Sequence, residues 1–173
     1  MSALGIVALI VSGIAILLAH PRLYWGETGA VGTPALIDLP VPFLLGHSGW
    51  GRYLHFLAAW LCLASGVIYV IHGFASGHFQ RNSYQVVQRL SYLSVVFVLG
   101  PSILLSGLAF SPALASVAPV IVNMFGGQQS ARTIHFFVAA AIVFFLFVHL
   151  FRVFTTGFRA RMRGMITGEV EPS

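Results

Sequence analysis

The sequence predicts an all-α protein built as a four-helix transmembrane bundle, and three observations support this. Hydrophobic residues make up 58% of the 173 residues, charged residues make up only 8%, and the mean hydropathy is +0.91. So little charge cannot cover the surface of a soluble globule of this length. Four apolar stretches, at about residues 3–19, 53–75, 90–110 and 133–154, approach or exceed the roughly 20 apolar residues that cross a hydrocarbon core.

The first stretch, residues 3–19, is short and begins almost at Met1. It has no basic segment before it and no obvious small-residue cleavage site after it, so we interpret it as a spanning helix that has lost its first turn. The connection that follows contains prolines, which oppose a long helix there. Its Trp25 and Trp50 suit the headgroup level of a bilayer, and with His47 they form the likeliest docking surface for a soluble partner. An interfacial aromatic belt is the alternative interpretation.

The third stretch contains Gly100-Pro101, and this pair predicts a kink or a local opening of the helix. The fourth stretch carries no charge between Arg132 and Arg152. No internal repeat or second soluble domain is visible, so residues 1–173 are expected to form one membrane domain.

Arginine predicts the orientation, because all nine basic residues are Arg. Six of them, Arg81, Arg89, Arg152, Arg159, Arg161 and Arg163, lie in the second connection or near the C-terminus. The positive-inside rule therefore places both termini in the cytoplasm. The net charge of +5 is explained by this topology, and nothing else in the sequence indicates a nucleic-acid partner. Cys62 is the only cysteine, so no intramolecular disulfide can form.

Histidine is the candidate for chemistry inside the membrane. The spans contain no Asp, Glu or Lys, and their ionisable groups away from the edges are His55, His72, His135 and His149. An imidazole in a bilayer is costly unless it is paired or ligated. For any one of these histidines, a hydrogen bond to a backbone carbonyl or hydroxyl of a neighbouring helix is an equally good explanation.

His55 and His135 are expected at the same depth, each about one turn inside a span that starts on the outer side of the membrane. Opposed imidazoles at one level are what a six-coordinate haem iron requires. Arg52 and Arg132 at the adjacent mouth could neutralise the haem propionates. These residues predict a haem b site.

His149 predicts a second haem nearer the cytoplasm. It follows His135 by fourteen residues. Each residue turns a helix by about 100°, so fourteen residues turn it by about 1400°, which is about 40° short of four full turns. Both rings are therefore expected on the same face of the helix. Its partner is harder to find. His72 lies about 100° off the face of His55, and His78 lies beyond the membrane edge.

Four segments resemble the bacterial cytochrome b561 and nickel-iron hydrogenase b-type cytochrome family, which is also related to the cytochrome b subunits of formate dehydrogenase and thiosulfate reductase. They are AHPRLYWG at 19–26, GRYLHF at 51–56, SGHF at 76–79 and FGGQQSARTIHF at 125–136. The resemblance covers essentially the whole chain. It implies a four-helix di-haem conduit between a periplasmic redox subunit and the quinone pool.

By this resemblance, His55 and His135 match the ligands of the outer haem, and His149 matches one ligand of the inner haem. Members of the family usually carry a His-Trp pair just before the stretch that aligns with residues 2–4, and that His is the other inner ligand. Here Met1 falls where the pair should end, so we expect a truncated or mis-annotated start. If Met1 is the true start, the inner haem is five-coordinate or absent.

The resemblance also implies a periplasmic partner, either a molybdopterin oxidoreductase or a hydrogenase. A quinone site is expected near the inner end, where His78, Gln85, Gln88 and Arg89 supply polar groups; the same residues could simply solvate a cytoplasmic loop. Two rival functions remain at this point. One is a small transporter, and the other is a haem-free assembly subunit whose histidines only join helices.

Overall fold

The computed structural model describes residues 3–27, 32–41, 49–75, 90–91 and 93–155, and in this part the chain is mostly helical. The two longest helices are α2 (Gly49–Ala75) and α8 (Gln128–Thr155). Both are long and apolar enough to cross a membrane, with mean hydropathies of 2.0 and 2.5 over their apolar parts. Only 11% of the apolar part of α2 and none of that of α8 is buried inside the protein. A soluble protein would bury such helices in its core, so these apolar surfaces are suited to contact lipid.

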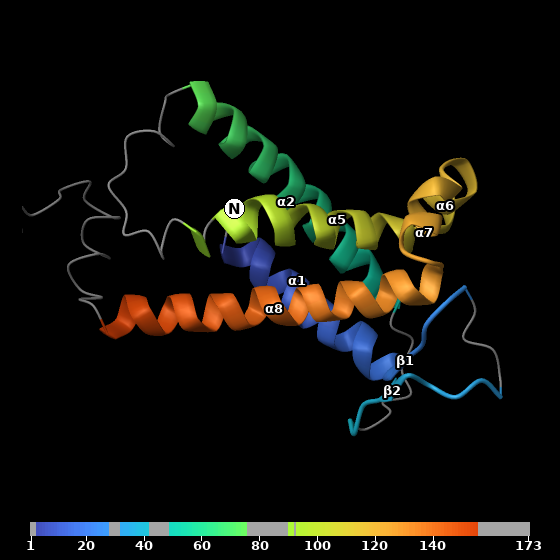
Figure 1. The fold of residues 1–173 in the computed structure, drawn as a ribbon. Coiled ribbons are helices and arrows are strands. Elements are labelled where there is room, and N and C mark those ends of the chain that lie inside the picture. The colour runs from blue at the N-terminus through green and yellow to red at the C-terminus, as the bar shows by residue number, and fades with distance from the viewer. Residues whose placement is uncertain (1–2, 28–31, 42–48, 76–89, 92, 156–173) are drawn as a thin grey trace, which may run out of the picture.

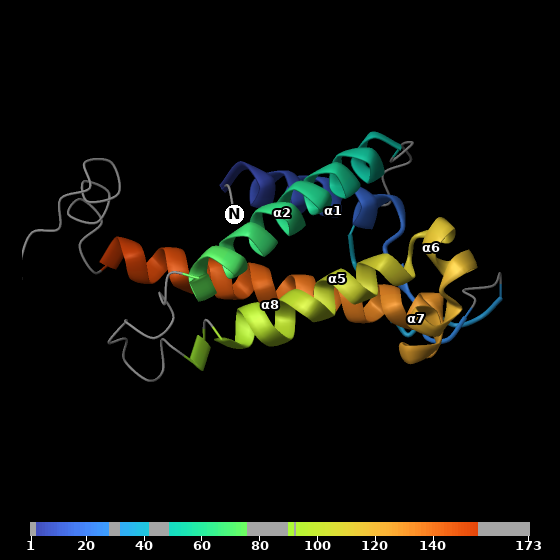
Figure 2. The same cartoon turned by 90° about the horizontal axis from the view of Figure 1, so that it is seen from above.

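Two further helices are apolar but shorter, namely α1 (Ala3–Ala19) and the segment Val95–Ala109. The helices form two pairs, with α1 packed along α2 and α5 (Gly100–Ala109) packed along α8 (Figures 1 and 2). Between α2 and α8, the described residues make few close backbone approaches. The backbones of α2 and α8 thus stay mostly apart.

After α1 the chain forms a small two-stranded ribbon. Pro21 follows His20, and a residue before proline is disfavoured in helical conformation, which explains why α1 ends at Ala19. Strand β1 (Arg22–Leu23) pairs antiparallel with β2 (Ile37–Asp38), with Arg22 opposite Asp38. The described part of this connection contains no long helix, as the prolines predict. We call this side of the molecule, where α2 and α8 also begin, the ribbon end (Figure 1).

The helix of the third apolar segment departs from regular α-helical hydrogen bonding where the sequence predicts a kink or a local opening. Residues Val95–Leu99 form a π-helical turn, η1, and the N–H of Gly100 donates to the carbonyl of Val95, five residues earlier. Pro101 has no N–H with which to continue the α-helical pattern, so the helix accommodates it by widening. A side chain at position 100 would also meet the Val95 carbonyl oxygen at 3.2 Å.

Between α5 and α8 lie two short helices that the sequence analysis did not predict, α6 (Pro112–Val117) and α7 (Pro119–Met124). Each begins with proline, whose fixed φ suits the first turn of a helix. The long helices also start earlier than predicted, α2 at Gly49 rather than near 53 and α8 at Gln128 rather than near 133. The predicted starts followed the apolar residues, but backbone hydrogen bonding continues a helix through polar residues too.

The ribbon end is fastened to the start of α8. The carbonyl of Gly26 accepts hydrogen bonds from the backbone N–H groups of Gln129 (3.0 Å) and Ser130 (3.2 Å), and the Gly26 N–H donates to Ser130 Oγ (2.7 Å). Thr133 Oγ1 donates to the carbonyl of Tyr24 at 2.6 Å. The loop after β1 thus caps the first turn of α8, whose N–H groups have no partner within the helix.

Candidate functional site

Two histidines face each other between the helix pairs. His55 is in the second turn of α2 and His135 is in the second turn of α8. Their ring centroids are 6.2 Å apart and the ring planes make an angle of 64°. The structure therefore brings together the two imidazoles that the sequence places at one depth.

The separation of these rings matches what one metal ion between them would need. A metal–nitrogen bond to imidazole is about 2.0–2.1 Å long, and with each ring centre roughly 1.1 Å behind its nitrogen, two opposed rings have centroids about 6.3 Å apart. The observed 6.2 Å agrees with this. The scarcity of close backbone approaches between α2 and α8 is also what a flat macrocycle between the helices would require. The residues present fit a bis-histidine porphyrin site.

A buried serine contacts each imidazole from the neighbouring helix of its pair. Ser12 Oγ on α1 lies 3.0 Å from His55 Nδ1, and Ser106 Oγ on α5 lies 3.1 Å from His135 Nδ1. Both serines are 0% exposed. The Nδ1 side of each ring is thus engaged by the protein, which leaves Nε2 as the nitrogen available to a metal.

Positive charge collects at the ribbon end beside this pair. The Arg132 guanidinium donates to the backbone carbonyl of His20 and is thereby held at the end of α1. Burial lowers the pKa of His20, and the nearby Arg132 and Arg52 lower it further. Arg52 and Arg132, one turn before His55 and His135, therefore share one electropositive neighbourhood, as an anchor for carboxylate groups would require.

The same neighbourhood borders a hollow of about 560 Å³. Polar and apolar side chains line it in similar measure, namely His20, Pro21, Arg22, Tyr24, Asp38, Leu39, Val41, Gln129 and Arg132. Within the part of the chain that the structure describes, the Oε1 atom of Gln129 is buried and accepts no hydrogen bond. The hollow thus offers both cationic donors and an acceptor.

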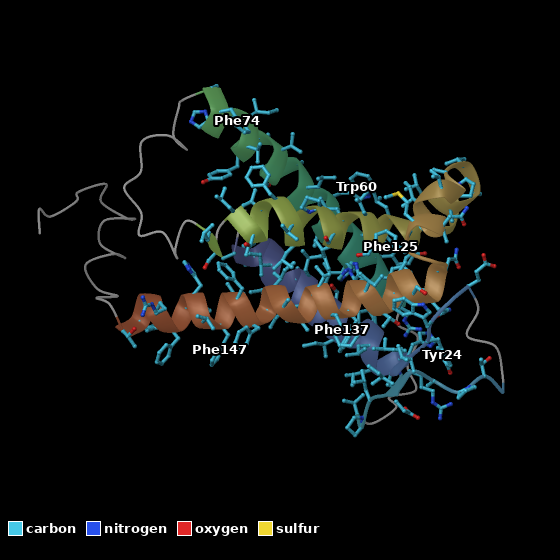
Figure 3. The ribbon with its side chains drawn as sticks, viewed as in Figure 1. Tyr24, Trp60, Phe74, Phe125, Phe137 and Phe147 are labelled. Atoms are coloured by element: carbon cyan, nitrogen blue, oxygen red, sulfur yellow. The ribbon has the colours of Figure 1, made fainter. Side chains whose placement is uncertain are left out.

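The opposite side of the molecule, where α2 ends at Ala75 and α8 ends at Thr155, is called the far end. His149 is half-buried there and its ring stacks on that of Phe145, with centroids 6.0 Å apart. The two long helices diverge toward this end, so that Phe74 of α2 and Phe147 of α8 lie well apart (Figure 3). His72 is exposed on α2, two residues before Phe74.

Several predicted residues lie outside the described residues. They are His47 of the docking surface, together with His78, Gln85, Gln88 and Arg89 of the predicted quinone site. The other members of the docking surface, Trp25 and Trp50, are 61% and 57% exposed.

Sequence reasoning missed the serines behind the histidines. Ser12-Gly13 and Ser106-Gly107 are the same dipeptide, but Ser65-Gly66 of α2 repeats it and a Cβ at Gly66 would meet nothing within 4 Å, so the dipeptide alone could not single out the two serines. Sequence reasoning also missed the role of Gly26, since a carbonyl that caps a helix more than a hundred residues later leaves no local pattern.

A family model for prokaryotic cytochrome b561 matches residues 1–168 of the chain. The putative protein-methionine-sulfoxide reductase subunit YedZ1 of Azospira oryzae is 26% identical over 132 residues, which are 61% of this chain and 65% of the relative. The match thus spans slightly less than two thirds of that relative's length. No solved structure matches the chain.

Proposed function

The chain belongs to the prokaryotic cytochrome b561 family of membrane haem b electron-transfer proteins, and we propose that it passes electrons between a periplasmic redox partner and the quinone pool. The observation that carries this proposal is the facing pair of His55 and His135, with ring centroids 6.2 Å apart. Each histidine comes from a helix that is long and apolar enough to cross a membrane. A haem b held by this pair would lie within the apolar layer, near the ribbon end.

In this proposal His55 and His135 hold the iron through Nε2, while Arg52 and Arg132 neutralise the propionates. When bound, haem b takes up and releases one electron at a time. The apolar faces of α2 and α8 would exclude water from the site, and His55 and His135 would hold the group in place. The protein thus needs no bond-making residue.

We propose that residues 1–173 form one domain with four spans, at about 3–19, 53–75, 90–110 and 133–154. With both termini in the cytoplasm, the ribbon end faces the periplasm of a bacterial inner membrane protein. His149 then lies near the cytoplasmic side, where it would ligate a second haem together with a residue that the described part of the chain does not supply.

The partner in this proposal is a periplasmic oxidoreductase subunit, a molybdopterin enzyme or a hydrogenase. Support comes from the similar protein, whose name makes it a subunit of a putative protein-methionine-sulfoxide reductase. The exposed Trp25 and Trp50 at the ribbon end supply the aromatic surface on which such a partner would dock. Quinone would exchange electrons at the far end.

The visible spectrum of the full chain purified from membranes tests the haem site. The wild type should show the reduced α-band of a bis-histidine haem b, and His55→Ala and His135→Ala should each lose the absorbance of the same haem. His20→Ala is the matched control, because His20 lies outside the helices and has no proposed ligand role. Wild-type protein without haem absorbance would contradict the proposal and favour a transporter or a haem-free assembly subunit.

A further inference from the structure

The two serines that face the histidines donate their single proton elsewhere. Ser12 Oγ lies 2.6 Å from the carbonyl oxygen of Ala8, and Ser106 Oγ lies 2.6 Å from that of Ser102. These short bonds to the carbonyl four residues earlier occupy the hydroxyl hydrogen. Toward the imidazole each serine then presents only lone pairs, so the histidine Nδ1 must carry a hydrogen and donate it.

This arrangement selects the tautomer that a metal site needs. With the hydrogen on Nδ1, the Nε2 lone pair of His55 and of His135 is free for iron. The opposite tautomer would set the Nδ1 lone pair against the lone pairs of the serine oxygen, and its Nε2–H could not ligate a metal. Because both serines are fully buried, no water can replace them as acceptor.

The same geometry occurs twice. Each hydroxyl also lies 3.2 Å from the carbonyl three residues earlier, Leu9 in α1 and Ile103 in α5. In both helices a glycine follows the serine and lies against the same imidazole. A Cβ at Gly13 would be 3.6 Å from His55 Cε1, and one at Gly107 would be 3.2 Å from His135 Cε1.

The two helix pairs are therefore equivalent around the site. In each pair one helix supplies the histidine and the other supplies a Ser-Gly step, in which the hydroxyl fixes the ring nitrogen and the glycine makes room for the ring edge. Two unrelated structural serines would have no reason to repeat every one of these contacts.

From this repeated geometry we propose that Ser12 and Ser106 are positioning residues of the haem site, which orient the two ligands and lower the haem reduction potential. The proposal rests on haem ligation by His55 and His135, as proposed above. A hydrogen bond accepted from Nδ1–H makes the imidazole a stronger electron donor, which favours ferric over ferrous iron. Both serines act in the same direction on one iron.

Redox titration of the full-length haem-loaded protein tests this proposal. Ser12→Ala and Ser106→Ala should each shift the ferric-to-ferrous preference about tenfold toward ferrous, a rise of about 59 mV in midpoint potential for one electron. Ser106→Thr keeps the hydroxyl and should retain the native potential. Ser102→Ala is the matched control, since Ser102 makes the same bond to the carbonyl four residues earlier, at 2.7 Å, but is only partly buried.

Native midpoint potentials in both alanine variants would overturn the proposal. If the alanine variants bind no haem, the threonine variant decides, because a full haem content there supports the hydroxyl's role and a loss of haem there contradicts it. The histidine variants separate this proposal from the function itself. Full haem content in His55→Ala and His135→Ala would contradict the proposed function. Loss of haem in these two variants, together with native potentials in the serine variants, would contradict only the positioning role.

Discussion

The ribbon end and the far end place the same residue type on the same helix, with different surroundings. At the ribbon end, His135 of α8 faces His55 of α2 at 6.2 Å and contacts Ser106 of α5. At the far end, His149 of α8 stacks on Phe145, four residues earlier on the same helix. One histidine meets groups from two other helices, whereas the other meets a ring of its own helix.

The difference shows that two histidines of one helix can meet very different neighbours. The spacing predicts that both rings share one face of α8, but α2 approaches α8 near the ribbon end, where His55 and His135 meet, and diverges from it further along (Figure 3). The way the helices cross therefore decides how near α2 and α8 come to each other at each height along the bundle. The following experiments break or sharpen this comparison, from the largest expected effect to the smallest.

His149→Ala tests whether the far end holds a haem at all. If it does, the substitution should lower the haem-to-protein ratio by about half while the spectrum of the ribbon-end haem stays native, because each iron loses its site with its ligand. A haem assay on purified protein gives this ratio. An unchanged ratio would mean that the protein carries only the ribbon-end haem, and loss of both haems would show that the ligand pairs are misassigned.

Among the described glycines, Gly127 is the one at which substitution by alanine should destabilise the ribbon end most. Gly127 has a φ of 115°, and a Cβ there would lie 2.4 Å from the carbonyl oxygen of Gly26. We expect a loss of about 1–3 kcal/mol in the free energy of unfolding, measured by thermal unfolding in detergent. Gly126→Ala is the control, since its Cβ would come only within 3.9 Å of Ser130 Oγ. Equal costs at both positions would mean that the contact with Gly26 is unimportant.

Gly107→Ala and Gly13→Ala compare the two ligands of the ribbon end. The added Cβ would be 3.2 Å from His135 Cε1 but 3.6 Å from His55 Cε1, so only the first must move its imidazole. Electron paramagnetic resonance of the ferric protein reports the orientation of the two ring planes. We expect a shifted low-spin signal in Gly107→Ala and a nearly native one in Gly13→Ala, and the reverse order would refute the packing described.

Arg132→Gln removes one positive charge next to the ribbon-end haem. Less positive charge stabilises the ferric state, so the midpoint potential should fall, and the shift should shrink as ionic strength rises. If the far end holds a haem as proposed, its potential should not respond. A shift shared equally by both haems would mean that the charge acts through the fold rather than locally.

Arg22→Ala is expected to have the smallest effect. Its ion pair with Asp38 is 3.2 Å long, but the two side chains are 63% and 60% exposed. Exposed pairs of this kind contribute about 0.2–1 kcal/mol, so the thermal midpoint should barely change. A large loss of stability would show that the ribbon depends on this pair.

Much of the fold followed from the sequence because the membrane restricts it strongly. Hydropathy indicated the apolar stretches in which α1, α2, α8 and the Val95–Ala109 segment lie, and Gly100-Pro101 marked the opened turn at η1. The helices α2 and α8 begin before the predicted apolar spans because the residues at their starts carry little hydropathy signal, and α6 and α7 were not predicted because six residues are too few to show a helical period.

The sequence by itself determined the residue types and the depth of the site, since apolar length sets where a residue sits in a bilayer and helical period sets which face it occupies. His55, His135 and His149 could be chosen on these grounds alone. Only the tertiary structure decided that His55 and His135 meet and that Ser12 and Ser106 contact their Nδ1 atoms. Those contacts depend on how the helices pair and on the angles at which they cross. The crossing angles are set by the packing of side chains from separate segments, and no local sequence pattern specifies them.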